Sequence, residues 1–186
     1  MDPKLDDDAL MIRTARGEEA AFRLLVQRWE HDVLAFLSAM LGSAEDAEDL
    51  AQETFVRIYR NAGNYRPEGM FRSWMLRIAG NLARSRLRRR RIIGWIPFDP
   101  TDHDVADQGA GPEAVLQAGQ TSDLIRGALA RLPDRQREAL VLHRFQGMKY
   151  KDIATTMGTT LPGVESLIQR ALAALRDELS RGDRMP

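Results

Sequence analysis

Residues 71–91 read FRSWMLRIAGNLARSRLRRRR, and the rest of the chain is organised around this segment. Its apolar side chains recur every three or four residues, which is the spacing of one face of an α-helix; they are Phe71, Trp74, Met75, Ile78 and Leu82. Its last nine residues carry six arginines, far more than a soluble core needs. The stretch therefore predicts a helix with one packing face, and with a second face suited to a negatively charged partner. That second face holds Arg77, Asn81, Arg84, Arg88 and Arg91.

Upstream of this stretch the sequence predicts three more helices, at about residues 7–16, 18–41 and 44–61. Gly17 and Gly42 stand where the first two end, and Ser43 is a capping residue for the third, whose first turns hold four carboxylates. Residues 61–70 contain glycine, proline and asparagine and predict a loop. A glycine inside the helix that follows, Gly80, predicts either close packing or a bend. Four helices of this size can share one core.

Downstream, residues 92–121 lack a sustained apolar stripe and predict an extended linker. Its Trp95, Ile96 and Phe98 are apolar enough to dock on another surface. Residues 122–186 predict a second helical domain, with helices at about 122–132, 134–146, 150–157 and 161–179. The expected fold class is all-α, with domains at 1–91 and 122–186 joined by the acidic linker 92–121 and with a helix-turn-helix in the second domain.

The net charge is zero, with 27 basic and 27 acidic residues, but the charge is segregated along the chain. Residues 1–65 carry a net charge of −6, residues 66–91 carry +8, residues 92–125 carry −6 and the rest carry +4. Such blocks predict several surfaces with different partners, the acidic ones for protein and the basic ones for phosphate.

The composition also narrows the classes of function. The chain has no cysteine, so disulfides and thiolate metal sites are excluded, and His31, His103 and His143 are too scattered for a metal site. No catalytic signature occurs, and no apolar run is long enough to span a membrane. We expect a soluble cytoplasmic protein that is not an enzyme, with no metal, no cofactor, no small-molecule substrate and no direct membrane insertion.

Residues 150–170, YKDIATTMGTTLPGVESLIQR, have the pattern of a helix-turn-helix. Ile153, Met157, Val164 and Leu167 supply a small core, and Gly158 fits the tight turn. A bare helical hairpin would also explain the apolar spacing. In a helix-turn-helix the second helix enters the major groove of DNA, and Glu165, Ser166, Gln169 and Arg170 would then face the bases.

The arginine run could neutralise several phosphates, although a solvated helix end would have the same composition. Tyr65, Phe71 and Trp74 flank the preceding loop, and aromatic rings beside a basic surface hold unstacked bases. Trp74 lies on the packing face, so a core position competes with a stacking role.

Together these stretches resemble bacterial RNA polymerase sigma factors of the sigma-70 family, in the extracytoplasmic-function (ECF, group IV) subgroup. The resemblance covers nearly the whole chain and rests on four segments in the family's order. They are DAEDLAQETFVRIYR (46–60), residues 71–91, LPDRQREALVLHRFQG (132–147) and the helix-turn-helix. It implies a promoter-specificity subunit that allows the polymerase to recognise and melt promoters and to start transcription.

The resemblance also implies which residues act. Core RNA polymerase would be bound by Asp46, Asp49, Leu50, Gln52, Glu53 and Val56. The minus-ten element of promoter DNA, including a flipped base, would be bound by Tyr65, Arg66, Phe71, Arg77, Asn81, Arg84, Arg88 and Arg89. The minus-thirty-five element would be bound by Lys151, Thr160, Glu165, Ser166, Gln169 and Arg170. An anti-sigma factor, clamped or wedged between the domains, would hold the protein in check in a stress or extracytoplasmic response.

The chain departs from the family pattern at Ser85, Glu165, Leu167 and Leu172, where acidic or basic residues of the family are replaced. These departures concern the promoter sequence more than the function. Two other functions fit the residues. One is a helix-turn-helix transcriptional regulator whose N-terminal helices dimerise or sense a ligand, and the other is an RNA-binding helical protein that uses the arginine run.

Overall fold

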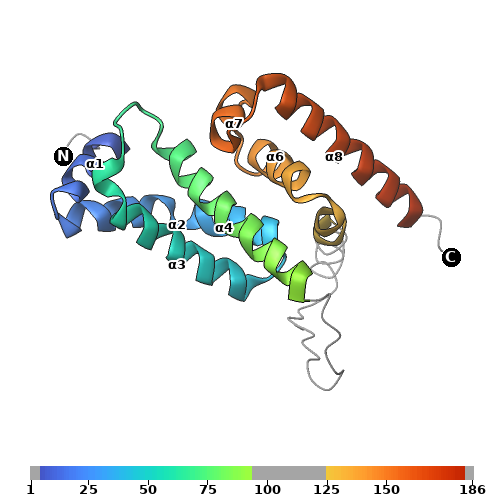
Figure 1. The fold of residues 1–186 in the computed structure, drawn as a ribbon, viewed down its shortest axis with the longest axis horizontal. Helices are drawn as coiled ribbons and strands as arrows, with labels where there is room; N and C mark the ends of the chain where they lie inside the picture. The colour runs from blue at the N-terminus through green and yellow to red at the C-terminus, as the bar shows by residue number, and fades with distance from the viewer. Residues whose placement is uncertain (1–4, 94–124, 183–186) are drawn as a thin grey trace, which may run out of the picture.

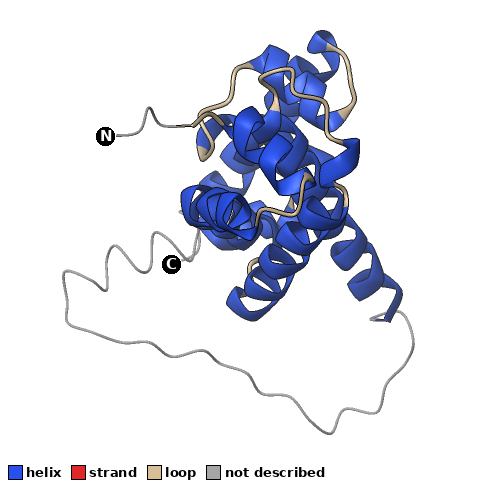
Figure 2. Ribbon diagram, turned by 90° about the vertical axis from the view of Figure 1, so that its left-hand side faces the viewer, coloured by secondary structure: helices blue, strands red, loops and turns tan. Residues whose placement is uncertain are grey.

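The computed structural model describes residues 5–93 and 125–182, and every regular element in these ranges is a helix (Figure 2). The expected all-α class is therefore confirmed. Most of the predicted linker, including Trp95, Ile96 and Phe98, lies outside the described residues; its first two positions, Ile92 and Ile93, belong to a helix. No helix in the described ranges is long and apolar enough to cross a membrane.

Two of the N-terminal helix boundaries lie at the capping residues that the sequence indicates, Gly42 and Ser43. Helix α1 (Asp7–Ala15) starts at Asp6, whose side chain accepts from the amide of Ala9. Helix α2 (Glu19–Leu41) ends at Gly42, whose φ of 68° is left-handed. Helix α3 (Ala44–Arg60) starts at Ser43, which accepts from the amide of Asp46. A short 3₁₀ turn, η1 (Ala62–Asn64), follows α3, and α4 (Phe71–Ile93) begins after the loop.

These helices enclose one apolar core. Leu25, Phe36, Met40, Ile58 and Met75 come from three different helices, and their side chains are fully buried. Each such side chain stabilises the fold by roughly 1.5–3 kcal/mol when it leaves water. The core therefore fixes the position of α4, and with it the loop that precedes α4.

The C-terminal domain holds a helix at residues 125–131, followed by α6 (Asp134–Arg144), α7 (Tyr150–Met157) and α8 (Leu161–Gly182). Gly158, with φ 60°, makes the turn from α7 to α8. Ile153, Val164 and Ile168 are buried between the helices, whereas Leu167, which was expected in this core, is half-buried. Helix α6 ends two residues before the predicted position, and α8 runs three residues past it.

Helix α4 belongs to the N-terminal domain and forms the surface on which the C-terminal domain packs (Figure 1). It packs on α2 and α3 on one side and on α6 and α7 on the other, and α2 also contacts α6. Its buried surface is consequently wider than the single packing face predicted from the sequence, and it includes Leu76, Ala79, Gly80 and Ala83. Residues far apart in the chain thus meet along the whole length of α4.

Candidate nucleic-acid and polymerase interfaces

A pocket of about 320 Å³ lies where the loop of residues 64–70 meets the first turns of α4. Its lining includes Tyr65, Arg66, Trp74 and Arg77, together with Thr155 of α7. The Tyr65 and Trp74 rings are 5.0 Å apart and tilted by 55°. Flat apolar walls beside guanidinium groups are what a nucleobase with its phosphate requires.

The structure brings some of the predicted minus-ten residues together and separates others. Tyr65, Arg66 and Arg77 line the pocket, while Phe71 is buried and packs its ring against Tyr65 at 5.9 Å. Asn81 lies one turn further along α4, outside the pocket lining, and accepts a hydrogen bond from Arg84. The pocket is therefore formed by the loop and the first two turns of the helix.

The loop is also held by a residue that the sequence did not indicate. Asp8 of α1 accepts from the hydroxyl of Tyr65 at 2.5 Å and from the amide of Gly69 at 2.7 Å. Burial of the ring, followed by the bond to Asp8, raises the pKa of Tyr65. Asp8 and Tyr65 are 57 residues apart, so no local sequence pattern could have paired them.

The arginine face of α4 contacts the C-terminal domain. Arg77 donates to the carbonyl oxygens of Thr155 and Thr156, near the C-terminal end of α7, where the helix dipole favours a cation. Arg91 forms a two-pronged ion pair with Asp134, with distances of 2.9 and 2.7 Å. Part of the negative partner that the sequence predicts for this face is thus supplied by the chain itself.

Arg88 and Arg89 differ from these neighbours. Both are exposed, and within the described residues neither forms an ion pair. They remain available to a phosphate while the two domains are in contact.

Gly80 allows a close approach between the domains. Glu138 of α6 is 1% exposed and forms an ion pair with Arg84 directly over Gly80. A Cβ atom at position 80 would clash with a carboxylate oxygen of Glu138. Burial raises the pKa of Glu138, and Arg84 opposes this shift. Of the two explanations for Gly80, close packing is therefore the correct one.

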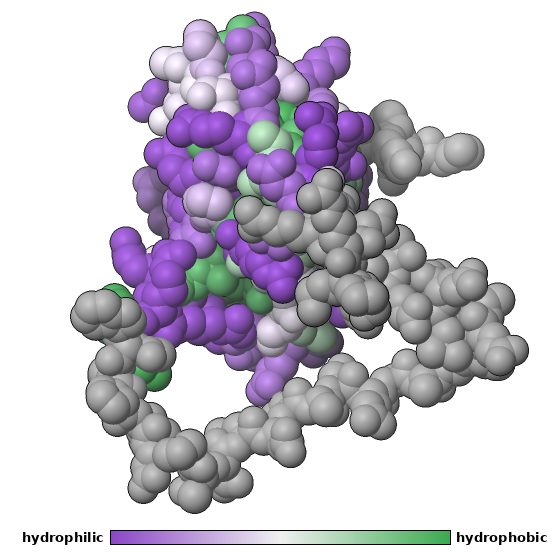
Figure 3. Space-filling model, turned by 90° about the vertical axis from the view of Figure 1, so that its right-hand side faces the viewer, coloured by the Kyte–Doolittle hydropathy of each residue, from purple (hydrophilic) through white to green (hydrophobic). Residues whose placement is uncertain are grey.

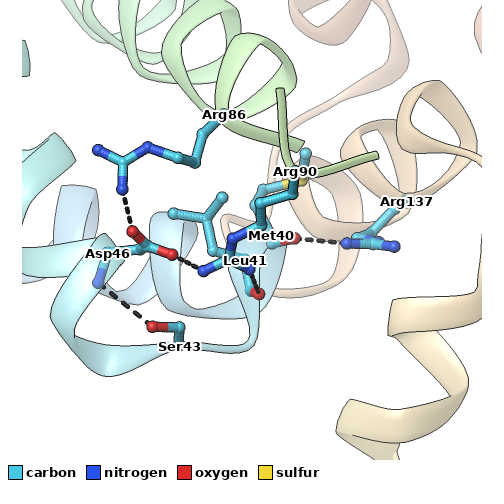
Figure 4. Close-up of polar contacts among 7 residues, drawn as sticks. All are labelled: Met40, Leu41, Ser43, Asp46, Arg86, Arg90 and Arg137. Carbon is cyan, nitrogen blue, oxygen red and sulfur yellow. Dashed lines mark hydrogen bonds and ion pairs between the residues drawn. The ribbon is translucent and has the colours of Figure 1, made fainter. Parts of the chain in front are cut away.

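Arg137 adds a further contact between the domains (Figure 4). Its side chain, 5% exposed, donates to the carbonyl of Met40 at 2.6 Å, near the C-terminal end of α2. It also donates to the carbonyls of Ala130 and Leu132 in its own domain. Burial lowers the pKa of Arg137. The two terminal nitrogens of the guanidinium donate to backbone oxygens, which carry no side-chain signature in the sequence, while its buried Nε has no hydrogen-bond partner among the described residues.

The predicted polymerase-binding residues of α3 divide into exposed and buried ones. Asp49, Gln52 and Val56 are exposed, whereas Leu50 is buried in the core. Asp46 forms ion pairs with Arg86 and Arg90 of α4, which leaves its side chain 14% exposed (Figure 4).

Glu53 is half-buried and pairs with Arg57 at 2.7 Å. A polar hollow of about 480 Å³ lies between α3 and α4, and its lining includes Asp49, Glu53, Arg86 and Arg89. An outside protein could therefore reach Asp49, Gln52, Glu53 and Val56.

The predicted minus-thirty-five residues lie on α7, on the turn and on the first half of α8. Thr160 accepts from the amide of Gly163 at 3.2 Å and so caps α8. Glu165, Gln169 and Arg170 are exposed, and Arg170 donates to the hydroxyl of Ser166 at 2.8 Å. Lys151 is exposed on α7. Among the described residues, the face seen from the right of Figure 1 is mostly hydrophilic, with an apolar patch near its middle (Figure 3). No cluster of described residues could hold a metal ion.

Comparison with known proteins gives the same division of the chain. The family Sigma-70 region 2 matches residues 25–92, and the family Sigma-70, region 4 matches residues 122–175. The RNA polymerase sigma-H factor of Pseudomonas aeruginosa is 34% identical, over 91% of this chain and 91% of its own length. The ECF RNA polymerase sigma factor SigE of Mycolicibacterium smegmatis is also 34% identical, over 97% of this chain and 71% of its own length.

A solved structure has the same fold. CnrH, in complex with the cytosolic domain of CnrY, matches with a TM-score of 0.70 and 28% identity, over 94% of this chain and 97% of CnrH. Three findings agree: the matches to both family regions, the relatives that are 34% identical along nearly the whole chain, and the shared fold. The chain belongs to the sigma-70 family of RNA polymerase sigma factors, in the extracytoplasmic-function group, whose members are promoter-specific transcription initiation factors.

Proposed function

We propose that this sigma factor divides promoter recognition between the pocket at the start of α4 and the exposed face of α8. The observation that carries the proposal is the pocket itself. It combines the tilted rings of Tyr65 and Trp74 with the guanidinium groups of Arg66 and Arg77, at the start of a helix that ends in arginines. This combination suits a single strand entering from a duplex.

At the minus-ten element, one base leaves the stack and enters the pocket. Stacking on an aromatic ring contributes about 1–3 kcal/mol per base and offsets much of the cost of unpairing it. Asn81, Arg84, Arg88 and Arg89 follow on α4 and contact the adjoining backbone, with a salt dependence typical of phosphate contacts.

At the minus-thirty-five element, α8 enters the major groove with its N-terminal half. Glu165 can accept from the amino group of cytosine, and Arg170 can bridge the two acceptors of guanine. Few cations lie on this helix, so its contacts supply specificity while α4 supplies the charge.

Core RNA polymerase binds the exposed residues of α3. Charge reversal there, as Asp49→Arg with Glu53→Arg, is expected to abolish co-purification with core polymerase, because like charges then face the partner. Glu45→Arg is the matched control, since Glu45 is exposed on the same helix outside the proposed surface. Unchanged co-purification of the double variant would rule out this interface.

The contact between the domains implies a regulated step. Arg77 and Arg84, which the proposal assigns to DNA, are held by α7 and α6. We infer that the domains separate before the minus-ten surface acts. An anti-sigma factor that stabilises the closed arrangement would then hold the protein in check; CnrH, which has the same fold, was solved in complex with a partner protein, the cytosolic domain of CnrY. The protein acts in the cytoplasm with the polymerase, and the polymerase performs the chemistry.

Run-off transcription tests the proposal. Core polymerase with this chain as the sole specificity subunit is expected to produce discrete transcripts from genomic DNA, and sequencing them would reveal the promoters. A helix-turn-helix regulator, the alternative function, would bind duplex DNA and leave core polymerase unable to start at a promoter. Discrete starts exclude that alternative, and their absence despite binding to core polymerase would exclude the proposal.

A further inference from the structure

We propose that Asp8 is a positioning residue, which holds the loop of residues 64–70 in the shape that receives the minus-ten base. The inference rests on the proposed function of the pocket. It assigns a role in promoter opening to α1, a helix that precedes the matched Sigma-70 region 2 segment of residues 25–92.

The two oxygens of Asp8 bind the two ends of the loop. One accepts from the hydroxyl of Tyr65, at the start of the loop, and the other accepts from the amide of Gly69, near its end. Between these points lie Arg66 and Glu68, which line the pocket. The carboxylate therefore fixes the span of the segment that carries two pocket residues and, through Tyr65, the orientation of a ring.

Helix α1 is a firm support for this carboxylate. Leu10 and Met11 are fully buried in the domain core. Arg28 of α2 binds Asp7 at 2.6 Å and the carbonyl of Leu5 at 3.0 Å, so the first turn of α1 is fastened to α2. In contrast, residues 66–69 of the loop are all exposed, and apolar burial contributes little to their order.

The negative charge of Asp8 indicates that this residue binds the loop and does not bind DNA. A carboxylate beside a phosphate-binding surface repels nucleic acid, unless its charge is offset by donors. Here a hydroxyl and an amide supply that offset, through hydrogen bonds of the strong, charge-assisted kind. A negative charge next to the pocket is thus tolerated because it orders the pocket.

The test uses the full chain with core polymerase and compares Asp8→Ala, Asp8→Asn and Tyr65→Phe. Asp8→Ala removes both bonds and is expected to lower open-complex formation, read by permanganate reactivity of promoter thymines, about tenfold. Asp8→Asn keeps an acceptor for Tyr65 but presents a donor to Gly69, so it should lower open-complex formation less than Asp8→Ala does. In the Tyr65→Phe background, Asp8→Ala should cause a smaller further loss than it does alone.

Glu19→Gln is the matched control, because it removes a carboxylate charge from an exposed position of α2 and leaves both the loop and the Asp7–Arg28 pair intact. Affinity for core polymerase and for minus-thirty-five duplex should stay at the wild-type value in all variants. Amide exchange at Gly69 should accelerate in both Asp8 variants and not in Glu19→Gln. A merely structural role would instead lower core affinity and thermal stability together.

The outcomes separate this inference from the proposed function. If the wild-type chain opens promoters and Asp8→Ala opens them equally well, the positioning role is refuted while the proposed function stands. A parallel fall in core affinity would also refute the positioning role. If the wild-type chain binds core polymerase but opens no promoter, the proposed function itself fails.

Discussion

Asp46 forms two ion pairs inside the N-terminal domain, whereas Asp49, three residues later, faces solvent. Both lie on the acidic start of α3, and the resemblance assigns both to polymerase binding. The difference arises because Asp46 points toward α4, where Arg86 and Arg90 approach it from successive turns (Figure 4). At this position, structural support is the role that the contacts favour.

Asp46→Asn is therefore expected to destabilise the domain by about 1–2 kcal/mol, since two arginines lose a largely buried partner. Solvent around Arg90 screens part of its attraction to Asp46, so the expected destabilisation is smaller than that of breaking a fully buried ion pair. Urea unfolding followed by circular dichroism measures it. Asp49→Asn is the control and should change the free energy of unfolding by less than about 0.5 kcal/mol. Equal effects of the two substitutions would contradict this reading.

At the scale of elements, α4 combines a packing role on both sides with a row of arginines. Gly80 weakens the helix by about 1 kcal/mol relative to alanine, yet its missing Cβ leaves room for the carboxylate of Glu138. The glycine thus favours contact between the domains at the expense of the helix itself.

Gly80→Ala is expected to separate the domains while leaving the helix at least as stable, because the new Cβ atom displaces Glu138 from Arg84. The radius of gyration from small-angle X-ray scattering should increase, and the thermal unfolding midpoint of the N-terminal domain should not fall. Gly127→Ala is the matched control, since Gly127 is also helical but has open space at its Cβ position. An unchanged radius of gyration in Gly80→Ala would show that Glu138 can move aside cheaply.

The helices themselves were predictable because their signals are local. Apolar spacing placed α4 from its first residue, and Gly42, Ser43 and Gly158 marked boundaries through their own backbone or side-chain preferences. The second buried side of α4 was not predictable, since apolar spacing does not tell which domain covers a surface. Contacts such as Arg77 with the carbonyl of Thr156 have no signature, because every residue has a carbonyl. The role of Asp8 was not predictable for a different reason, since its partners Tyr65 and Gly69 lie 57 and 61 residues away in the chain.

For the whole molecule, the two domains pack directly on one another through α4, α6 and α7, with α2 joined to α6 (Figure 1). The domain assignment of 1–91 and 122–186 stays a prediction, but the contact between the two parts places a buried carboxylate, Glu138, between them. Its pKa links the arrangement of the domains to pH.

Acidification is expected to favour the closed arrangement. Burial raises the pKa of Glu138 when the domains are packed, so the closed form binds a proton more readily than the separated form. The stabilisation of the closed form by this group is complete below the ordinary glutamate pKa of about 4.3 and is lost as the pH rises through the raised value. Arg84 and Arg135 oppose the shift, and Asp134 adds to it.

Energy transfer between dyes measures this equilibrium, and the absence of cysteine in the chain makes site-specific labelling simple. Glu48→Cys on α3 and Asp177→Cys on α8 are exposed positions for the dyes. Transfer should rise between neutral pH and about pH 5 in the otherwise wild-type chain, and Glu138→Gln should remove the pH dependence. A dependence that persists in Glu138→Gln would assign it to another group.

Gly80 also has a consequence for genetics. Any Cβ atom at this position must displace the carboxylate of Glu138, and a larger side chain must displace it further, so alanine, serine, aspartate and valine should separate the domains to a degree that grows with their size. A selection for alleles that escape repression should therefore recover chemically unrelated substitutions at codon 80. At codon 138, the size and charge of the side chain matter, and the recovered alleles should be correspondingly graded in strength.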